Sequence, residues 1–160
     1  MNEIANLDLK PLMANAIGEV FDKMLSIEAG VCEEGPQQSE TEERIVGSVG
    51  LAGEVMGRIN IHLSDAFARL IAASMLGIEM EEIEGQEEVH DVVGELSNMI
   101  GGQLKAHISD CGLVCDLSLP SITTGSDFQI ESKGWVKHEK VGFCHEQHSA
   151  LAEVYVKAGN

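Results

Sequence analysis

Two stretches of this sequence repeat each other and decide its fold. The repeat aligns Asn15-Ala-Ile-Gly18-Glu19-Val-Phe-Asp22 with Asp91-Val-Val-Gly94-Glu95-Leu-Ser-Asn98. Each stretch lies in a longer run whose apolar residues recur every three or four positions, which indicates an amphipathic helix. Strand-like segments follow each run. We therefore expect an α/β fold of the α+β type, built from two αββ halves whose long helices pack on one antiparallel sheet.

The other elements follow from local patterns. Period-two alternation and turn residues predict a strand pair over 45–51 and 55–63. Ser64 is placed to cap a helix that ends at Gly77. Polar composition predicts an exposed loop over 33–43. The full expectation is a single domain over 1–160 with helices over 11–28, 64–76 and 87–109, further strands near 113–119, 128–132, 135–144 and 149–157, and a loop over 120–125.

Composition and charge exclude several classes of partner. The chain has 160 residues and a net charge of −17. Nucleic acids and anionic membranes are bound by basic patches, and the sequence contains no basic cluster. The N-terminus lacks the pattern of a signal peptide, and no apolar run approaches the ~20 residues of a membrane helix. We expect a cytoplasmic protein that binds neither nucleic acid nor membrane.

The cysteines and histidines suggest no metal centre. Four cysteines are present, without a CxxC pair or a zinc-like spacing, and we expect free thiols in a reducing cytoplasm. A weaker alternative is a metal or ligand site at the histidine-rich end, formed by His138, Cys144, His145 and His148. Because neighbouring residues of a strand point to opposite faces, Cys144 and His145 would diverge. We therefore predict no metal site.

The outer side of the helix over 87–109 carries the candidate functional residues. Glu95 and Asn98 are three positions apart and so are neighbours on the helix surface, opposite its apolar side. Three glycines in one helix are costly, at ~1 kcal/mol each relative to alanine. They either let another helix pack closely or clear space for a partner protein. The residues that we place on the same outer side are Asp91, Gly94, Gly101, Gly102 and Lys105.

An amide beside a carboxylate suits one kind of chemistry. The Asn98 amide is able to orient a water molecule, because it donates and accepts hydrogen bonds. The Glu95 carboxylate is able to pair with a lysine of a partner. Catalysis of phosphoryl transfer depends largely on such positioning. The spacing alone is weak evidence, since ordinary solvated helix faces also show it.

Three segments in order carry a resemblance to a known family. They are Glu88-Val-His-Asp-Val-Val-Gly-Glu95-Leu-Ser-Asn98-Met-Ile-Gly-Gly102, Leu117-Ser-Leu-Pro120-Ser-Ile-Thr-Thr-Gly125, and the earlier Gly53-Glu-Val-Met-Gly57-Arg-Ile-Asn-Ile-His-Leu63-Ser with its helix ending at Leu76-Gly77. Together they resemble the CheX members of the CheC/CheX/FliY phosphatase family of bacterial chemotaxis. The resemblance extends from about Leu12 to Val156.

The resemblance implies a function and its residues. It implies a phosphatase for the aspartyl phosphate of a CheY-like response regulator. Asn98 would orient the attacking water, and Glu95 would pair with the regulator's lysine. It also implies a homodimer without a cofactor of its own, because Mg²⁺ belongs to the regulator. The alternative is an inactive CheX-like scaffold that docks a regulator.

The first helix is predicted to carry a degenerate second site. CheC-type relatives bear the motif on both long helices, whereas this chain has Glu19 and Asp22 on the first. Asp22 lacks an amide donor, and its charge would repel phosphoryl oxygens. We therefore expect one working site, as in CheX-type relatives.

Overall fold

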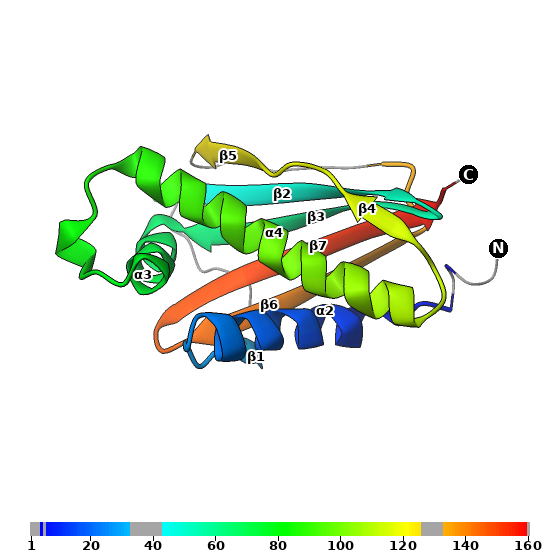
Figure 1. Ribbon diagram of the computed structural model, residues 1–160, viewed down its shortest axis with the longest axis horizontal. Coiled ribbons are helices and arrows are strands. Elements are labelled where there is room, and N and C mark those ends of the chain that lie inside the picture. The colour runs from blue at the N-terminus through cyan, green and yellow to red at the C-terminus, as the bar shows by residue number, and fades with distance from the viewer. Residues whose placement is uncertain (1–3, 5, 33–42, 126–132, 160) are drawn as a thin grey trace.

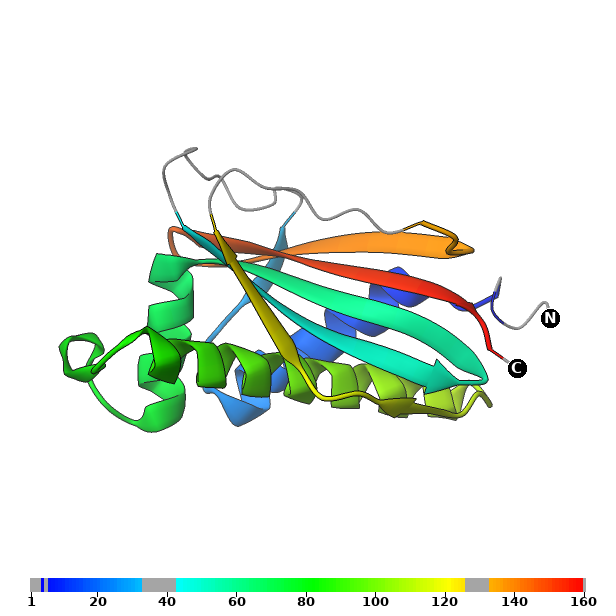
Figure 2. The same ribbon diagram turned by 90° about the horizontal axis from the view of Figure 1, so that it is seen from above.

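The computed structural model describes residues 4, 6–32, 43–125 and 133–159. In these residues, seven strands form one antiparallel sheet, and the helices cover one of its faces (Figures 1 and 2). The helices are α2 (Leu9–Glu19), continued by a π-helical turn (Val20–Met24), α3 (Asp65–Leu76), a 3₁₀ turn (Met80–Glu82) and α4 (Gln86–Asp110). The strands are β1 (Gly30–Cys32), β2 (Arg44–Gly53), β3 (Val55–Ser64), β4 (Cys115–Leu117), β5 (Ser121–Gly125), β6 (Lys137–His145) and β7 (His148–Ala158).

The sheet is assembled from two hairpins. Its order is β1-β6-β7-β3-β2-β4, and β5 also pairs with β2. The hairpins β2–β3 and β6–β7 meet at the centre through β3 and β7, where Asn60 lies opposite Glu153. Each hairpin follows a long helix, α2 or α4, and these two helices run in opposite directions across the sheet (Figure 1). The predicted arrangement of two αββ halves is confirmed.

The core lies between this sheet and the helices. Three aromatic rings, Phe21, Phe67 and Phe143, meet there with centroids 5.3 to 6.2 Å apart. Helix α3 crosses the end of the sheet, seen end-on in Figure 1. Its predicted boundaries are confirmed: Ser64 Oγ accepts a hydrogen bond from Phe67 N at 3.1 Å, and Gly77 ends the helix at φ 70°.

Residues 120–125 were predicted as a loop, and this prediction was wrong. Ser121–Gly125 forms β5, which pairs with Arg44–Ser48 of β2. Ile122 and two β-branched threonines suit a strand, and the pairing satisfies backbone groups at the edge of β2. The first helix also differs from its predicted range: the α-helix ends at Glu19, and one π-helical turn follows it.

The last strand of the chain does not lie at an edge of the sheet. β7 is central, and β1 covers β6 over Gly142–Cys144. The homodimer that the family resemblance implies stays a prediction. Two predicted segments lie outside the described residues, namely most of the loop over 33–43 and the strand over 128–132. Within the described ranges, no helix is long and apolar enough to cross a membrane.

The prediction of four free thiols was wrong. Cys32 and Cys144 form a disulfide, with their Cα atoms 6.1 Å apart. The bond ties the short strand β1 to β6. Gly30 of β1 lies opposite Cys144 of β6. These cysteines are separated by 112 positions in the sequence, so no local spacing indicated the pair. Cys111 and Cys115 are free.

Candidate functional site

Helix α4 lies diagonally across the sheet and presents one ridge to solvent (Figure 1). Its packed side is fully buried at Val89, Val93, Leu96, Ile100, Leu104 and Ile108. Glu95 is exposed and Asn98 is half-buried, so both side chains lie on the outer side. The helical period fixes this placement, because positions 95 and 98 do not lie on the side of the helix whose apolar residues contact the core.

The Glu95 and Asn98 side chains have no polar partner among the described residues. In the part of the chain that the structure describes, no hydrogen bond or ion pair involves the Glu95 carboxylate or the Asn98 amide. By contrast, the hydroxyl of neighbouring Ser97 is buried and donates to the carbonyl oxygen of Val93 at 2.8 Å. The hydrogen-bonding capacity of Glu95 and Asn98 is therefore available to a second molecule.

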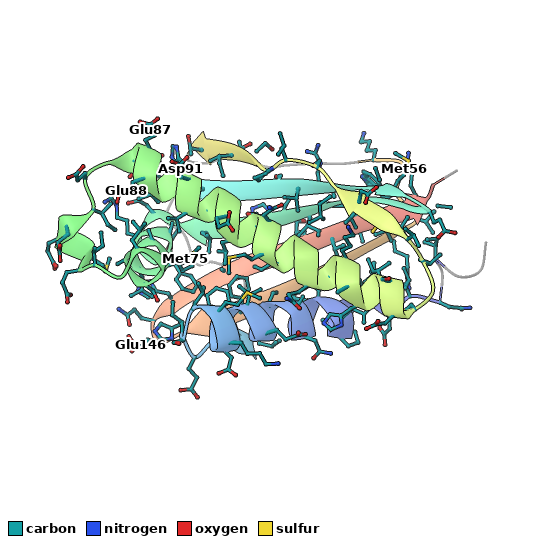
Figure 3. All side chains as sticks on the ribbon, in the orientation of Figure 1. Met56, Met75, Glu87, Glu88, Asp91 and Glu146 are labelled. Carbon is teal, nitrogen blue, oxygen red and sulfur yellow. A yellow bond between two sulfur atoms is a disulfide. The ribbon has the colours of Figure 1, made fainter. Side chains whose placement is uncertain are left out.

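The ridge is acidic at the end before this pair, and the lysine beyond the pair is held in an ion pair. Asp91 is exposed one turn before Glu95, and Figure 3 shows it near Glu87 at the N-terminal end of α4. Lys105, two turns beyond Asn98, is held to β4 by an ion pair of 3.5 Å with Asp116. A cationic group of a partner would be attracted to the Asp91–Glu95 end of the ridge.

Gly94 and Gly101 were predicted on the solvent side of the helix, and this prediction was wrong. Gly101 is buried, and a Cβ atom there would lie 2.9 Å from Val49 and 3.3 Å from Leu117. Gly94 is also buried, and a Cβ atom would lie 3.6 Å from Pro120. They allow strands and the β4–β5 connection to approach the helix. Gly102 differs, because nothing lies within 4 Å of its Cβ position.

The repeated motif on the first helix has a different environment. Glu19 accepts a hydrogen bond from His107 Nε2 of α4 at 2.5 Å, so its carboxylate is occupied. Asp22 is exposed on the π-helical turn. Both side chains line a hollow of about 440 Å³, together with Lys23 and Glu28. The two helices therefore present unequal versions of one motif.

The histidine-rich end is occupied by other contacts. Cys144 belongs to the disulfide. His145 Nδ1 donates to the carbonyl oxygen of Glu28 at 2.6 Å, and the His148 ring stacks on Phe67 with centroids 5.3 Å apart. Among the described residues, no group of three or more histidine, cysteine or acidic side chains is arranged to hold a metal ion.

A buried polar cluster lies on the sheet face opposite the helices. The Glu153 carboxylate accepts hydrogen bonds from His62 Nε2 at 2.5 Å, from Tyr155 OH at 3.0 Å and from His138 Nε2 at 3.1 Å. Burial alone would raise the pKa of Glu153, but the hydrogen bonds and the charge of His62 outweigh burial and lower this pKa to about 2. Period-two alternation along β3 puts His62 on the face opposite to that of the core residue Leu63, and nothing in the sequence indicates that this end of that face is buried.

The match to known proteins identifies the family. The family model described as "Chemotaxis phosphatase CheX" matches residues 45–144, a range that contains both Glu95 and Asn98. The chain belongs to the CheX family. A curated relative, "CheY-P phosphatase CheX" of Thermotoga maritima, is 26% identical over 121 residues, which are 75% of this chain and 76% of the relative.

Solved structures of CheX proteins share the fold. Chemotaxis protein CheX from Desulfovibrio desulfuricans superimposes with a TM-score of 0.79 at 21% identity, and the match covers 94% of this chain and all of that one. The CheX chain of a CheX–CheY–BeF₃–Mg²⁺ complex from Borrelia burgdorferi gives a TM-score of 0.69 at 24% identity, over 92% of this chain and 96% of that one.

Proposed function

We propose that this CheX-family protein accelerates hydrolysis of the aspartyl phosphate on a CheY-like receiver domain. The observation that carries the proposal is the pair Glu95 and Asn98, two outward side chains without a partner in the described chain, on a ridge inside the CheX match. The named activity of the Thermotoga relative and the CheY partner in the Borrelia complex support it. Because receiver domains act inside the cell, we also propose a cytoplasmic location.

Asn98 is proposed as the catalytic residue. Its amide enters the receiver's active site and holds a water molecule in line with the bond between phosphorus and the aspartyl oxygen. The water oxygen forms the new bond to phosphorus as that older bond breaks. The products are the free aspartate carboxylate and inorganic phosphate, which takes up the hydrogen atoms of the water. When bound in the receiver, Mg²⁺ neutralises charge on the phosphoryl group, so this chain needs no metal of its own.

Glu95 is proposed to position the complex. Its carboxylate pairs with the lysine that contacts the phosphoryl group in the receiver, and this ion pair sets the register of α4 in the active site. One turn away along the ridge, Asn98 then lies over the phosphoryl group. Asp91 adds negative charge at the same end and attracts the cationic side chain.

The first helix is proposed to be inactive. Glu19 already accepts a hydrogen bond from His107, and Asp22 has no N–H donor with which to hold water. The negative charge of Asp22 would also repel the phosphoryl oxygens. We therefore expect Asp22→Asn to leave the hydrolysis rate unchanged, since the amide restores only one half of the motif.

Loss of phosphate from a purified receiver domain tests the proposal. The receiver encoded nearest to this protein's gene is charged with a small phosphodonor, and its dephosphorylation is followed with and without this protein. Asn98→Ala should abolish the acceleration, a loss of at least ~100-fold given the usual effect of removing one positioning group. Gln103→Ala, which removes another amide from the same helix, serves as the matched control.

Two outcomes would contradict the proposal. If the wild-type chain binds phosphorylated receivers but never accelerates their hydrolysis, the scaffold alternative holds. If Asn98→Ala and Gln103→Ala have equal activity, the water is oriented by another group.

Sedimentation of the same samples tests the predicted homodimer, for which the mass should be twice the 17.2 kDa of one chain.

A further inference from the structure

Leu119 is the most exposed of the large apolar side chains that the structure describes, at 90% of its free surface. A single exposed leucine is ordinary in itself, so its position decides whether it matters. It lies in the connection between β4 and β5, which Figure 1 shows along one side of α4. The contacts of this connection with α4 locate Leu119 along the helix.

The connection runs antiparallel to α4, along the side that carries Gly94 and Gly101. Its start is fixed by Leu117, whose side chain packs over Gly101, and its end by Pro120, which packs over Gly94. Gly94 and Gly101 are about 10 Å apart at 1.5 Å per helical residue. Extended chain from Leu117 to Pro120 covers about the same length at ~3.3 Å per residue. Leu119 therefore lies level with the turn of α4 that carries Glu95 and Asn98.

The backbone on either side of Leu119 is held in place. Gly50 N donates to Ser118 Oγ at 2.7 Å, and Ser118 N donates to the carbonyl oxygen of Gly50 at 2.9 Å. Pro120 has a fixed φ and restricts the residue before it to extended conformations. The side chain is thus presented to solvent by an ordered segment. Binding through it costs little conformational entropy.

We propose that Leu119 is an affinity contact for the phosphorylated receiver domain. It would pack on an apolar part of the receiver's surface while Asn98 lies in the receiver's active site. This inference rests on the proposed function. We assign this contact to the receiver and not to another protein for a reason of charge. Asp91 and Glu95 make one end of the same ridge acidic, and this charge complements the lysine of a receiver active site. Protein–protein interfaces commonly place apolar side chains at the core of the contact and polar side chains around it.

The proposal separates affinity from chemistry. Leu119 does not reach the reacting atoms in this scheme, so its removal should weaken docking and leave the rate within the complex unchanged. Asn98 should behave in the opposite way. Leu119→Ala is expected to raise the half-saturating receiver concentration roughly tenfold, and Leu119→Asp should raise it further, because a charge would then be desolvated at the contact.

Two measurements on the full chain test this. The first is hydrolysis over a range of phosphorylated receiver concentrations. The second is binding to the same receiver held in its phosphorylated state by BeF₃⁻ and Mg²⁺, which does not depend on turnover. Val114→Asp and Val136→Asp are matched controls, because these apolar side chains are 63% and 65% exposed. Val114 follows the end of α4, at least ~18 Å along the helix from Asn98. Both controls should bind like wild type.

The possible results distinguish this inference from the function on which it rests. A tenfold weaker affinity of Leu119→Ala with unchanged saturated rate supports the contact. Unchanged affinity of both Leu119 variants, in a wild-type background that is active, overturns the inference alone. A lower saturated rate without a change in affinity also overturns it. If the wild-type chain neither binds nor hydrolyses any phosphorylated receiver, the proposed function fails first.

Discussion

Replacing Glu153 by glutamine should destabilise the protein at neutral pH and have little effect in strong acid. The Glu153 side chain is buried between two histidines and a tyrosine, and its pKa falls from 4.5 to about 2 on folding. At 1.36 kcal/mol for each unit of pKa, this shift corresponds to about 3 kcal/mol of folding free energy.

The sign of the pH dependence follows from the direction of this shift. Because the pKa is lower in the folded protein, the stabilisation is fully present above the unfolded value of 4.5 and disappears as the pH falls toward about 2. Glu153→Gln should therefore lower the free energy of unfolding by about 3 kcal/mol at pH 7. The gap between variant and wild type should close between about pH 5 and pH 2.

Denaturant unfolding at pH 7, 4 and 2.5 measures this gap. The whole chain carries a net charge of −17, so acid also relieves general repulsion, and only differences between variants are informative. Glu146→Gln removes a carboxylate that is 68% exposed and should leave stability nearly unchanged. The reasoning is refuted if Glu153→Gln matches Glu146→Gln at pH 7, or if its deficit persists unchanged at pH 2.5.

Two further predictions concern the stability of the sheet and of its contact with α4. Reduction of the disulfide, or Cys32→Ser, should lower the free energy of unfolding by ~2–4 kcal/mol, because the bond closes a loop of 112 positions. Denaturant unfolding with and without dithiothreitol measures this change, with Cys111→Ser as the control. Equal unfolding midpoints would contradict the prediction. Gly101→Ala should unfold at a lower temperature than Gly102→Ala, since only the first places a Cβ atom 2.9 Å from Val49. Equal melting temperatures would show that Val49 moves aside at no cost in stability.

Much of the fold was predictable because helices and strands bury regular patterns. The three-to-four-residue period located α4 within a residue at each end, and the caps at Ser64 and Gly77 fixed α3. β5 escaped prediction because the segment is short, despite its β-branched residues, and its pairing with β2 is not visible in the sequence. The disulfide escaped for a related reason: the fold, and not the sequence spacing, brings Cys32 to Cys144.

The candidate site was predictable only in its polar members. Glu95 and Asn98 were placed outward because polar side chains avoid the apolar side of a helix. A glycine has no side chain and gives no such signal, so Gly94 and Gly101 were placed on the wrong side. Their burial also explains how Leu119 reaches the level of the pair. The missing side chains at positions 94 and 101 allow Pro120 and Leu117 to pack directly on the helix.

The two halves of the chain show how one copy of a repeated motif is left available. On α4, Glu95 has no partner in the described chain, and the residue before it, Gly94, packs under Pro120. On α2, the corresponding Gly18 has open space around it, while Glu19 is held by His107 from the other long helix. Helix α4 thus supplies both the free motif and the histidine that occupies the second copy. A change at His107 would free Glu19 but restore no amide at position 22, so the asymmetry depends on two independent differences and is not reversed by either one.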